Sequence, residues 1–208
     1  MRSPIKSFEL NIKSVKELHA LHQAFEKLLP AIDLSEILRA ELVSTVSALD
    51  CYLHDIVRSK MKKLVFDSIA LNDLPANFRS FQIPLKCAKQ LIDAQTDTEK
   101  DAIIVQTLKE TLYKFSFESE QTVEYAMSYI GIKKIWSKLS TNMGMSPADI
   151  KTQLNLIVRR RNNIAHQSDI SNLTTMEKDP INRSDVEYVI NYIEKLTESI
   201  DAVISAEI

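Results

Sequence analysis

The stretch Val158-Arg159-Arg160-Arg161-Asn162-Asn163-Ile164-Ala165-His166 places arginine, amide and imidazole side chains in a segment that has the pattern of a buried helix. Ile150, Leu154 and Ile157 precede it at the spacing of a core-facing helical stripe. Arg161 then occupies a position where this stripe would hold leucine. An unpaired buried charge costs several kcal/mol, roughly 3–5 when a partner is lost, so its guanidinium must be paired or lie beside a cavity. The sequence therefore predicts a polar pocket next to this helix.

Glycine is scarce in the chain. Its 208 residues include two glycines, whereas average usage would give about fifteen. Strand-rich folds with many tight turns need residues that tolerate positive φ, so this scarcity favours long helices and few turns. The length is sufficient for one domain with its own core. We predict an all-α fold, a helical bundle whose second and C-terminal helices are long.

The bulk charge and the cysteines restrict the function classes. A net charge of −2 excludes general attraction to nucleic acid, so any RNA contact must come from a local basic patch. Cys51 and Cys87 lack metal-type spacing and are expected to be free core thiols in a reducing compartment. No apolar run approaches the ~20 residues of a membrane span, and no signal peptide is recognised. We expect a cytoplasmic protein without a membrane contact, metal or cofactor.

Capping patterns and apolar spacing predict the order of the helices. Ser14 with Glu17, and Asp33 with Glu36, have the spacing of capping boxes. Ser146-Pro147 provides a cap and a first-turn proline for the helix that carries the opening motif. The expected helices cover about 15–28, 35–66, 84–94, 98–117, 119–130, 132–143, 146–166 and 184–206, with an irregular start at 1–13 and loops at 71–83 and 167–182.

The C-terminal helix has a strict heptad seam. Such a seam packs either within the chain or against a second copy, and three heptads are few for a free coiled coil. Intramolecular packing is favoured, and a dimer seam stays open as the alternative. The seam consists of Val186, Val189, Ile193, Leu196, Ile200 and Val203.

Arg161, Asn162 and His166 suit phosphodiester cleavage without a metal ion. An imidazole can take the proton of a ribose 2′-hydroxyl or donate one to the leaving 5′-oxygen. A guanidinium holds the scissile phosphate through two hydrogen bonds, and an amide can position the nucleotide or the imidazole. On spacing alone, a helix C-terminus with a solvated arginine and a histidine near the last carbonyls explains the same residues.

Helical geometry adds a condition to this catalytic interpretation. Residues five apart in a regular helix lie about 140° apart around its axis, so Arg161 and His166 point in different directions. For both to meet one phosphate, the helix must break or tighten near Asn163, or a second subunit must supply the missing half.

These residues carry a resemblance to a known family. Arg161 to His166 resembles the R-N-x-I-A-H form of the Arg-x4–6-His motif of the HEPN superfamily. Ile37 to Arg39 and Ser47 to Asp55 resemble the opening long helix of its RiboL-PSP branch. Glu120 to Trp136 and the closing helix after residue 183 are similar to that branch as well. The resemblance covers nearly the whole chain from about residue 33.

The resemblance implies a helical, usually dimeric domain in which motifs from two protomers line one cleft. For many members it also implies a metal-independent endoribonuclease of toxin–antitoxin or antiphage systems. Arg161 and His166 match the fixed positions of the motif, and Asn162 matches its frequent polar position. Ser168 replaces the tyrosine that marks toxins paired with nucleotidyltransferase antitoxins, so tyrosine adenylylation is not expected here. We predict one HEPN-like domain over 1–208, with residues 1–32 as an N-terminal extension plus first helix.

A polar strip on the second helix supplies further candidates. Ser47, Asp50, His54 and Arg58 follow one another at helical spacing on one face. Asp50 is our fourth candidate catalytic residue, expected to pair with Arg161 or orient His166; a solvated helix face is the equal alternative. His54 is a weaker candidate for a second acid or base, with surface or capping use favoured.

Other basic residues and histidines have simpler expected roles. Arg159 and Arg160 are expected to stay solvated and to bind RNA by attracting phosphate. His19 and His22 are expected to be ordinary surface residues rather than metal ligands.

The leading hypothesis is a homodimeric HEPN-type endoribonuclease, a toxin or defence effector with a possible antitoxin or defence-system partner, that leaves 2′,3′-cyclic phosphate and 5′-hydroxyl ends. The alternative is a non-catalytic HEPN module that senses RNA or nucleotide, or dimerises. An all-helical interaction protein with an accidental motif is a third possibility.

Overall fold

Helices form most of the chain in the computed structural model, which describes residues 3–29, 31–67, 69–172 and 174–207. Within these residues the strands are confined to one small antiparallel hairpin, so the all-α prediction is confirmed. The elements are α1 (Pro4–Leu28), α2 (Ser35–Phe66), the 3₁₀ turn η1 (Leu71–Asp73), α3 (Ala76–Arg79), α4 (Leu85–Asp93), α5 (Asp97–Leu112), α6 (Glu120–Tyr129), α7 (Ile135–Met143), α8 (Pro147–Gln167), β1 (Ile170–Asn172), β2 (Glu177–Lys178) and α9 (Arg183–Glu207).

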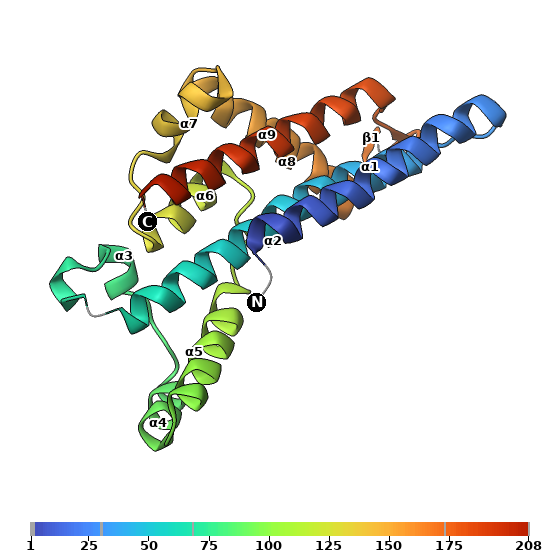
Figure 1. Ribbon diagram of the computed structural model, residues 1–208. Helices are drawn as coiled ribbons and strands as arrows, with labels where there is room; N and C mark the ends of the chain where they lie inside the picture. The colour runs from blue at the N-terminus through green and yellow to red at the C-terminus, as the bar shows by residue number, and fades with distance from the viewer. Residues whose placement is uncertain (1–2, 30, 68, 173, 208) are drawn as a thin grey trace.

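The long helix α2 is the centre of the fold. It contacts α1, α5, α6, α8 and α9, and Figure 1 shows α1, α2 and α9 running side by side while α4 and α5 project from them. Because several helices cover α2, its buried residues extend around more than one face, as Val46, Tyr52 and Val57 show. The predicted stripe is buried throughout; it consists of Leu38, Leu42, Thr45, Leu49, Leu53 and Ile56.

The heptad seam of α9 packs inside the chain. Its six residues are buried, and α9 contacts α1, α2 and α7. The favoured intramolecular interpretation is confirmed. The alternative, a seam between two copies, is wrong because the seam already forms part of the core.

The first helix starts earlier than predicted. Residues up to 13 were expected to be irregular, but α1 begins at Pro4, a residue whose fixed φ suits the first turn. Phe8, Ile12 and Val15 are buried at helical spacing, and the Phe8 ring meets Tyr52 of α2 edge-on at 6.0 Å. The alternation of apolar residues in this segment concealed a helical face.

The two histidines of α1 are not surface residues, contrary to expectation. His22 is 3% exposed, and His19 Nδ1 lies 2.7 Å from Oε2 of Glu41, whose side chain is fully buried in α2. Burial raises the pKa of the Glu41 carboxyl, while the hydrogen bond and charge of His19 act in the opposite direction. These polar residues therefore form a buried contact between α1 and α2.

Two connecting segments also differ from the predictions. The 71–83 loop contains η1 and α3, and the 167–182 loop folds into the β1–β2 hairpin. Helix α5 is capped by Thr96 with Glu99, rather than beginning near Thr98, and it ends at Leu112 instead of about 117. This early end releases residues 113–119, hereafter the α5–α6 linker, which approach α2 and α8. Among the described residues, none of the helices combines the length and apolarity that a bilayer crossing needs.

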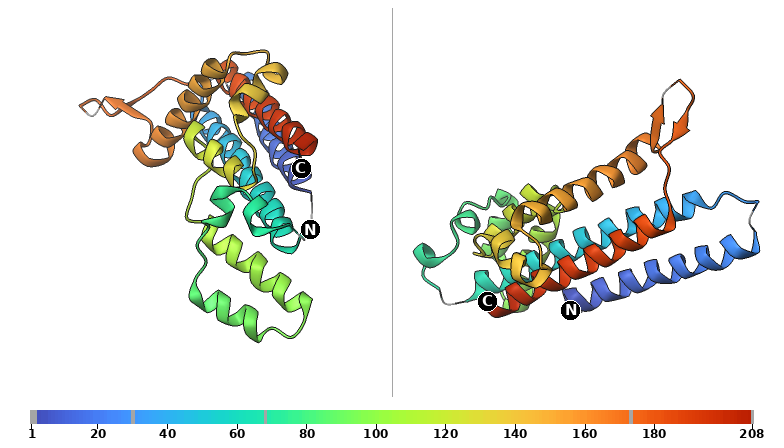
Figure 2. Two further views of the ribbon diagram at one scale, coloured as in Figure 1. Left: turned by 90° about the vertical axis from the view of Figure 1, so that its left-hand side faces the viewer. Right: turned by 90° about the horizontal axis from the view of Figure 1, so that it is seen from above.

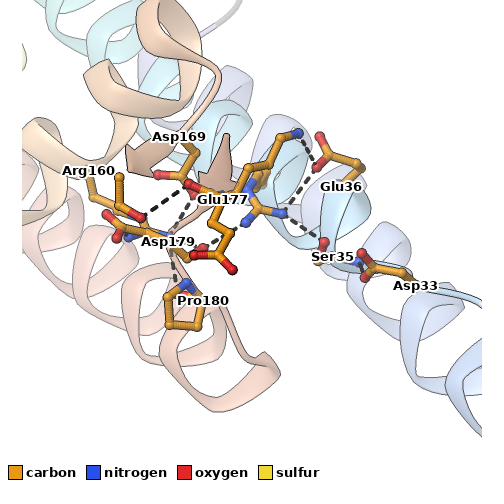
Figure 3. A network of polar contacts seen from close by, with 11 residues as sticks. Asp33, Ser35, Glu36, Arg160, Asp169, Glu177, Asp179 and Pro180 are labelled. Atoms are coloured by element: carbon orange, nitrogen blue, oxygen red, sulfur yellow. Dashed lines mark hydrogen bonds and ion pairs between the residues drawn. The ribbon is translucent and has the colours of Figure 1, made fainter. Parts of the chain in front are cut away.

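A buried ionic network fastens the hairpin to the helices (Figure 3). Asp169 has a fully buried side chain, and its Oδ2 accepts hydrogen bonds from Arg39 Nε at 2.8 Å and Arg160 Nη2 at 2.7 Å. Arg39 also donates to Ser35 Oγ and to the carbonyl oxygen of Asp179. Ser168 and Asp169 adopt left-handed backbone conformations, with φ of 52° and 60°. The network thus joins the start of α2 to the turn that follows α8. Figure 2 shows the hairpin projecting beyond the end of α8.

Replacing Arg39 should destabilise the fold strongly. In Arg39→Ala, one of the two cations that neutralise buried Asp169 is lost, and we expect the free energy of unfolding to fall by about 3 kcal/mol. Urea denaturation followed by circular dichroism measures it. Lys178→Ala, which breaks an exposed contact of Lys178 with Glu36, is the control and should cost under about 1 kcal/mol. Equal losses in both variants would contradict the assignment.

Candidate functional site

Four helical and linker segments enclose a cleft of about 810 Å³ between α2 and α8, hereafter the α2–α8 cleft. Its walls come from α2, the end of α5, the α5–α6 linker and the C-terminal half of α8. The four predicted catalytic residues Arg161, Asn162, His166 and Asp50 all line it, and so does His54. The cleft therefore brings together residues that lie more than a hundred positions apart in the sequence.

Helix α8 carries Arg161 and His166 without a break. Ser146 caps its start by accepting a hydrogen bond from the Asp149 amide, and the helix continues to Gln167. The break or tightening near Asn163, which was one of two conditions for the catalytic interpretation, does not occur. Arg161 and His166 nevertheless line the same cleft, with His166 at its more exposed end. The remaining condition is a second subunit that supplies the missing half of the site.

Arg161 is both paired and placed beside a cavity. Its Nη1 donates to Glu118 Oε1 and to Asn162 Oδ1, each at 3.0 Å. The Nε of Arg161 is buried and has no hydrogen-bond partner among the described residues. One side of the guanidinium is thus held by protein oxygens, while other donors are left for a ligand. An anion in the cleft would satisfy them.

Glu118 is a site residue that the sequence did not reveal. It lies in the α5–α6 linker, is 7% exposed, and has one buried carboxylate oxygen without a partner in the described part of the chain. A buried arginine requires an acid nearby, but no sequence spacing identifies which of the 28 acidic residues supplies it. Glu118 precedes the cap residue Ser119 of α6 and falls between the helices expected at 98–117 and 119–130.

Asp50 lines the cleft but makes neither of its expected contacts. Its Oδ1 accepts a hydrogen bond from the Phe117 amide at 2.6 Å, and none of the described hydrogen bonds joins it to Arg161 or His166. The expectation that Asp50 pairs with Arg161 is therefore wrong, because Glu118 takes that place. Asp50 instead holds the α5–α6 linker against α2.

The rest of the polar strip divides between two surfaces. His54 lines the cleft, with Nε2 3.1 Å from the Phe115 carbonyl oxygen and 3.7 Å from Asp50 Oδ1. Arg58 lines it one turn later; its Nη2 lies 2.5 Å from Asp55, and its Nε is buried without a partner among the described residues. Ser47 lies in a different depression, beside α1. Cys51, which was expected in the core, is exposed at the edge of the cleft, whereas Cys87 is buried as expected.

The two arginines before the motif have different environments. Arg159 is exposed, as expected. Arg160 is not solvated: it pairs with Asp169 at 2.7 Å and Asp179 at 3.0 Å, and it donates to the Pro180 carbonyl oxygen (Figure 3). The prediction of a solvated Arg160 is wrong because the residues on either side of the hairpin, Asp169, Asp179 and Pro180, supply acceptors for its guanidinium. Contacts between residues about twenty positions apart, such as Arg160 with Asp179 and Pro180, follow no local sequence pattern.

The described residues contain no group of three or more His, Cys, Asp or Glu side chains that could hold a metal ion. The cleft offers two guanidinium groups, two imidazoles, an amide and the Lys109 ammonium, beside the carboxylates of Asp50, Asp55 and Glu118. Its cationic donors can bind phosphate through charge-assisted hydrogen bonds. With an imidazole at hand for proton transfer, this arrangement is chemically suited to act on a phosphodiester.

The family model described as RiboL-PSP-HEPN matches residues 9–206 of the chain. The match includes all of the cleft residues named above and agrees with the resemblance found in the sequence motifs. No curated protein and no solved structure matches.

The Arg161–Glu118 contact should be energetically coupled. Both groups are largely buried, so Glu118→Ala and Arg161→Ala should each destabilise the fold, and the double variant should cost less than their sum. We expect a coupling energy of about 1–3 kcal/mol from a double-mutant cycle in urea. Glu120→Ala with Lys151→Ala, a more exposed pair separated by 3.9 Å, is the matched control, with coupling near zero. Additive effects of Glu118 and Arg161 would contradict the assignment.

Proposed function

The chain belongs to the RiboL-PSP-HEPN family, and from this premise we propose that it is a metal-independent endoribonuclease acting on RNA. One observation carries the proposal: Arg161, Asn162 and His166 line a single cleft, and the Nη2 group of Arg161 makes no hydrogen bond to the described residues. Its family provides the expectation of a nuclease or nucleotide-related module, and the residues of the cleft provide groups of the required chemistry.

In the proposed reaction the ribose 2′-oxygen attacks the adjacent phosphorus atom. The bond from phosphorus to the 5′-oxygen breaks, which leaves a 2′,3′-cyclic phosphate and a 5′-hydroxyl. Arg161 binds the nonbridging oxygens and offsets the charge that grows on them, and Glu118 holds the guanidinium in place. His166 transfers a proton at the exposed end of the cleft, where exchange with water is easy.

Loss of His166 should abolish most of the activity. The purified wild-type protein should cleave single-stranded RNA at the same rate with and without EDTA, because no metal takes part in the reaction. His166→Ala should be slower by about 10²–10⁴-fold, since acid–base catalysis is worth this much. Gel electrophoresis measures the rate, and mass spectrometry identifies the cyclic phosphate ends.

His19→Gln is the control for this experiment because it changes a histidine outside the cleft, and it should cleave at close to the wild-type rate. Equal cleavage by wild type and His166→Ala would refute the proposal, as would dependence on a divalent metal.

We propose further that the nuclease is a toxin or antiphage effector. Arrest of growth on expression of wild type, absent with His166→Ala, supports that role, and equal growth contradicts it.

We also propose that the active form is a homodimer. The family resemblance implies two protomers around one cleft. The seam of α9 is buried in the core of one chain, so the contact between protomers must use another surface. Light scattering should give twice the chain mass of 23.7 kDa at micromolar concentration. A single-chain mass over the whole concentration range would refute the dimer without affecting the nuclease proposal.

A second candidate is a HEPN module that binds RNA or nucleotide without cleaving it. It is favoured by the engagement of Arg160 with acidic residues and by the net charge of −2, which leave a small basic surface for RNA. Fluorescence anisotropy distinguishes the two: tight binding of labelled RNA that is recovered intact selects the module, and cleavage selects the enzyme.

A further inference from the structure

The α2–α8 cleft has an imidazole on each of two walls. His166 belongs to α8, and His54 belongs to α2. Cleavage through the 2′-oxygen needs a group that removes the 2′-hydroxyl proton and a group that protonates the leaving 5′-oxygen. Since α8 is regular, it contributes one imidazole to the cleft and no second acid or base of this type.

We propose that His54 is a second catalytic residue, the general base toward the ribose 2′-hydroxyl, and that His166 is the general acid. This inference rests on the proposed nuclease function and adds a division of roles within one chain.

The hydrogen bond of His54 fixes which ring nitrogen is the base. Its Nε2 lies 3.1 Å from the Phe115 carbonyl oxygen, an atom that only accepts, so Nε2 carries the proton. The lone pair is then on Nδ1, which makes no hydrogen bond to the described residues. Neutral His54 is therefore held in the tautomer that has a free basic nitrogen.

Asp50 stabilises the charge that His54 acquires after accepting a proton. Its Oδ1 lies 3.7 Å from His54 Nε2 and is anchored by the Phe117 amide at 2.6 Å. The Phe117 ring packs against the imidazole, with ring centres 4.6 Å apart. An oriented imidazole with a carboxylate near the nitrogen away from the base is the arrangement used by acid–base histidines. Asp50 acts here as a positioning residue.

The cleft also contains guanidinium groups that can bind the phosphate. Arg58 follows His54 by one turn on α2, and Arg161 precedes His166 on α8. Each has a buried Nε without a partner in the described part of the chain. Guanidinium groups bind phosphate oxygens through charge-assisted hydrogen bonds, and these two come from different walls of the cleft. The volume of about 810 Å³ lies within the range of small-ligand sites.

The proposed reaction exchanges one bond to phosphorus for another and moves two protons. Nδ1 of His54 takes the 2′-hydroxyl proton, and the 2′-oxygen forms a bond to phosphorus. The phosphorus–5′-oxygen bond breaks with its electron pair on the 5′-oxygen, which takes a proton from His166. Both histidines return to their starting states when the cleft exchanges protons with water.

A purely structural His54 would link α2 to the α5–α6 linker through the Phe115 contact. His54→Gln separates the two roles, because the glutamine amide keeps a donor for the Phe115 oxygen but cannot take a proton. His19→Gln makes the same change at a histidine outside the cleft and serves as the matched control. Circular dichroism and urea unfolding establish that both variants fold.

The deciding experiment compares two RNA substrates in single-turnover cleavage. One has the ordinary 5′-oxygen at the scissile bond, and the other has sulfur in that bridging position. A thiolate leaves without a proton, since thiols are far stronger acids than alcohols. His54→Gln should be slower than wild type by about 10²–10⁴-fold on both substrates. His166→Ala should be slow on the oxygen substrate and recover most of the wild-type rate on the sulfur substrate.

Each other outcome overturns a defined statement. Wild-type rates for a folded His54→Gln refute the catalytic role of His54 and leave the nuclease proposal intact. Recovery of His54→Gln on the sulfur substrate refutes its assignment as the base. A wild type that cleaves neither substrate refutes the proposed function together with this inference.

Discussion

The ion pair between Arg161 and Glu118 joins α8 to the α5–α6 linker, and the α2–α8 cleft depends on it. A guanidinium on the apolar stripe of a core helix must be neutralised, and the linker supplies the carboxylate that does so. Asp50 fastens the same linker to α2 through the Phe117 amide. The linker is thus tied to both helical walls by carboxylates, and these ties keep a polar space open between well-packed helices.

A second set of ionic contacts holds the C-terminal end of α8. Asp169 follows His166 by three residues, and its buried carboxylate is bound by Arg39 of α2 and by Arg160 of α8 itself. The left-handed turn at Ser168 and Asp169 ends the helix where these contacts require it. Basic residues near the motif therefore serve two purposes: Arg160 stabilises the frame, while Arg161 faces the cleft.

The parts of the structure that the sequence predicted are those with local periodic signals. Helix α2, the caps and length of α8, and the seam of α9 followed from apolar spacing, and Arg161 stood out because it interrupts such a pattern. The misses share a different cause. Glu118, the engagement of Arg160 and the buried pair of His19 with Glu41 depend on contacts between distant segments. No spacing rule encodes these contacts, and a polar residue that is neutralised by a distant partner looks solvated in the sequence.

A heptad seam often joins two chains, but the seam of α9 packs within one chain and so serves folding rather than assembly. Val203 and Ile204 lie in the core close to the end of α9, so the last turns of this helix contribute to the core. A shortened chain without α9 leaves the apolar faces of α2 and α7 bare, and such surfaces promote aggregation. Fusion partners or affinity tags are therefore better joined through a spacer than set directly against these final turns.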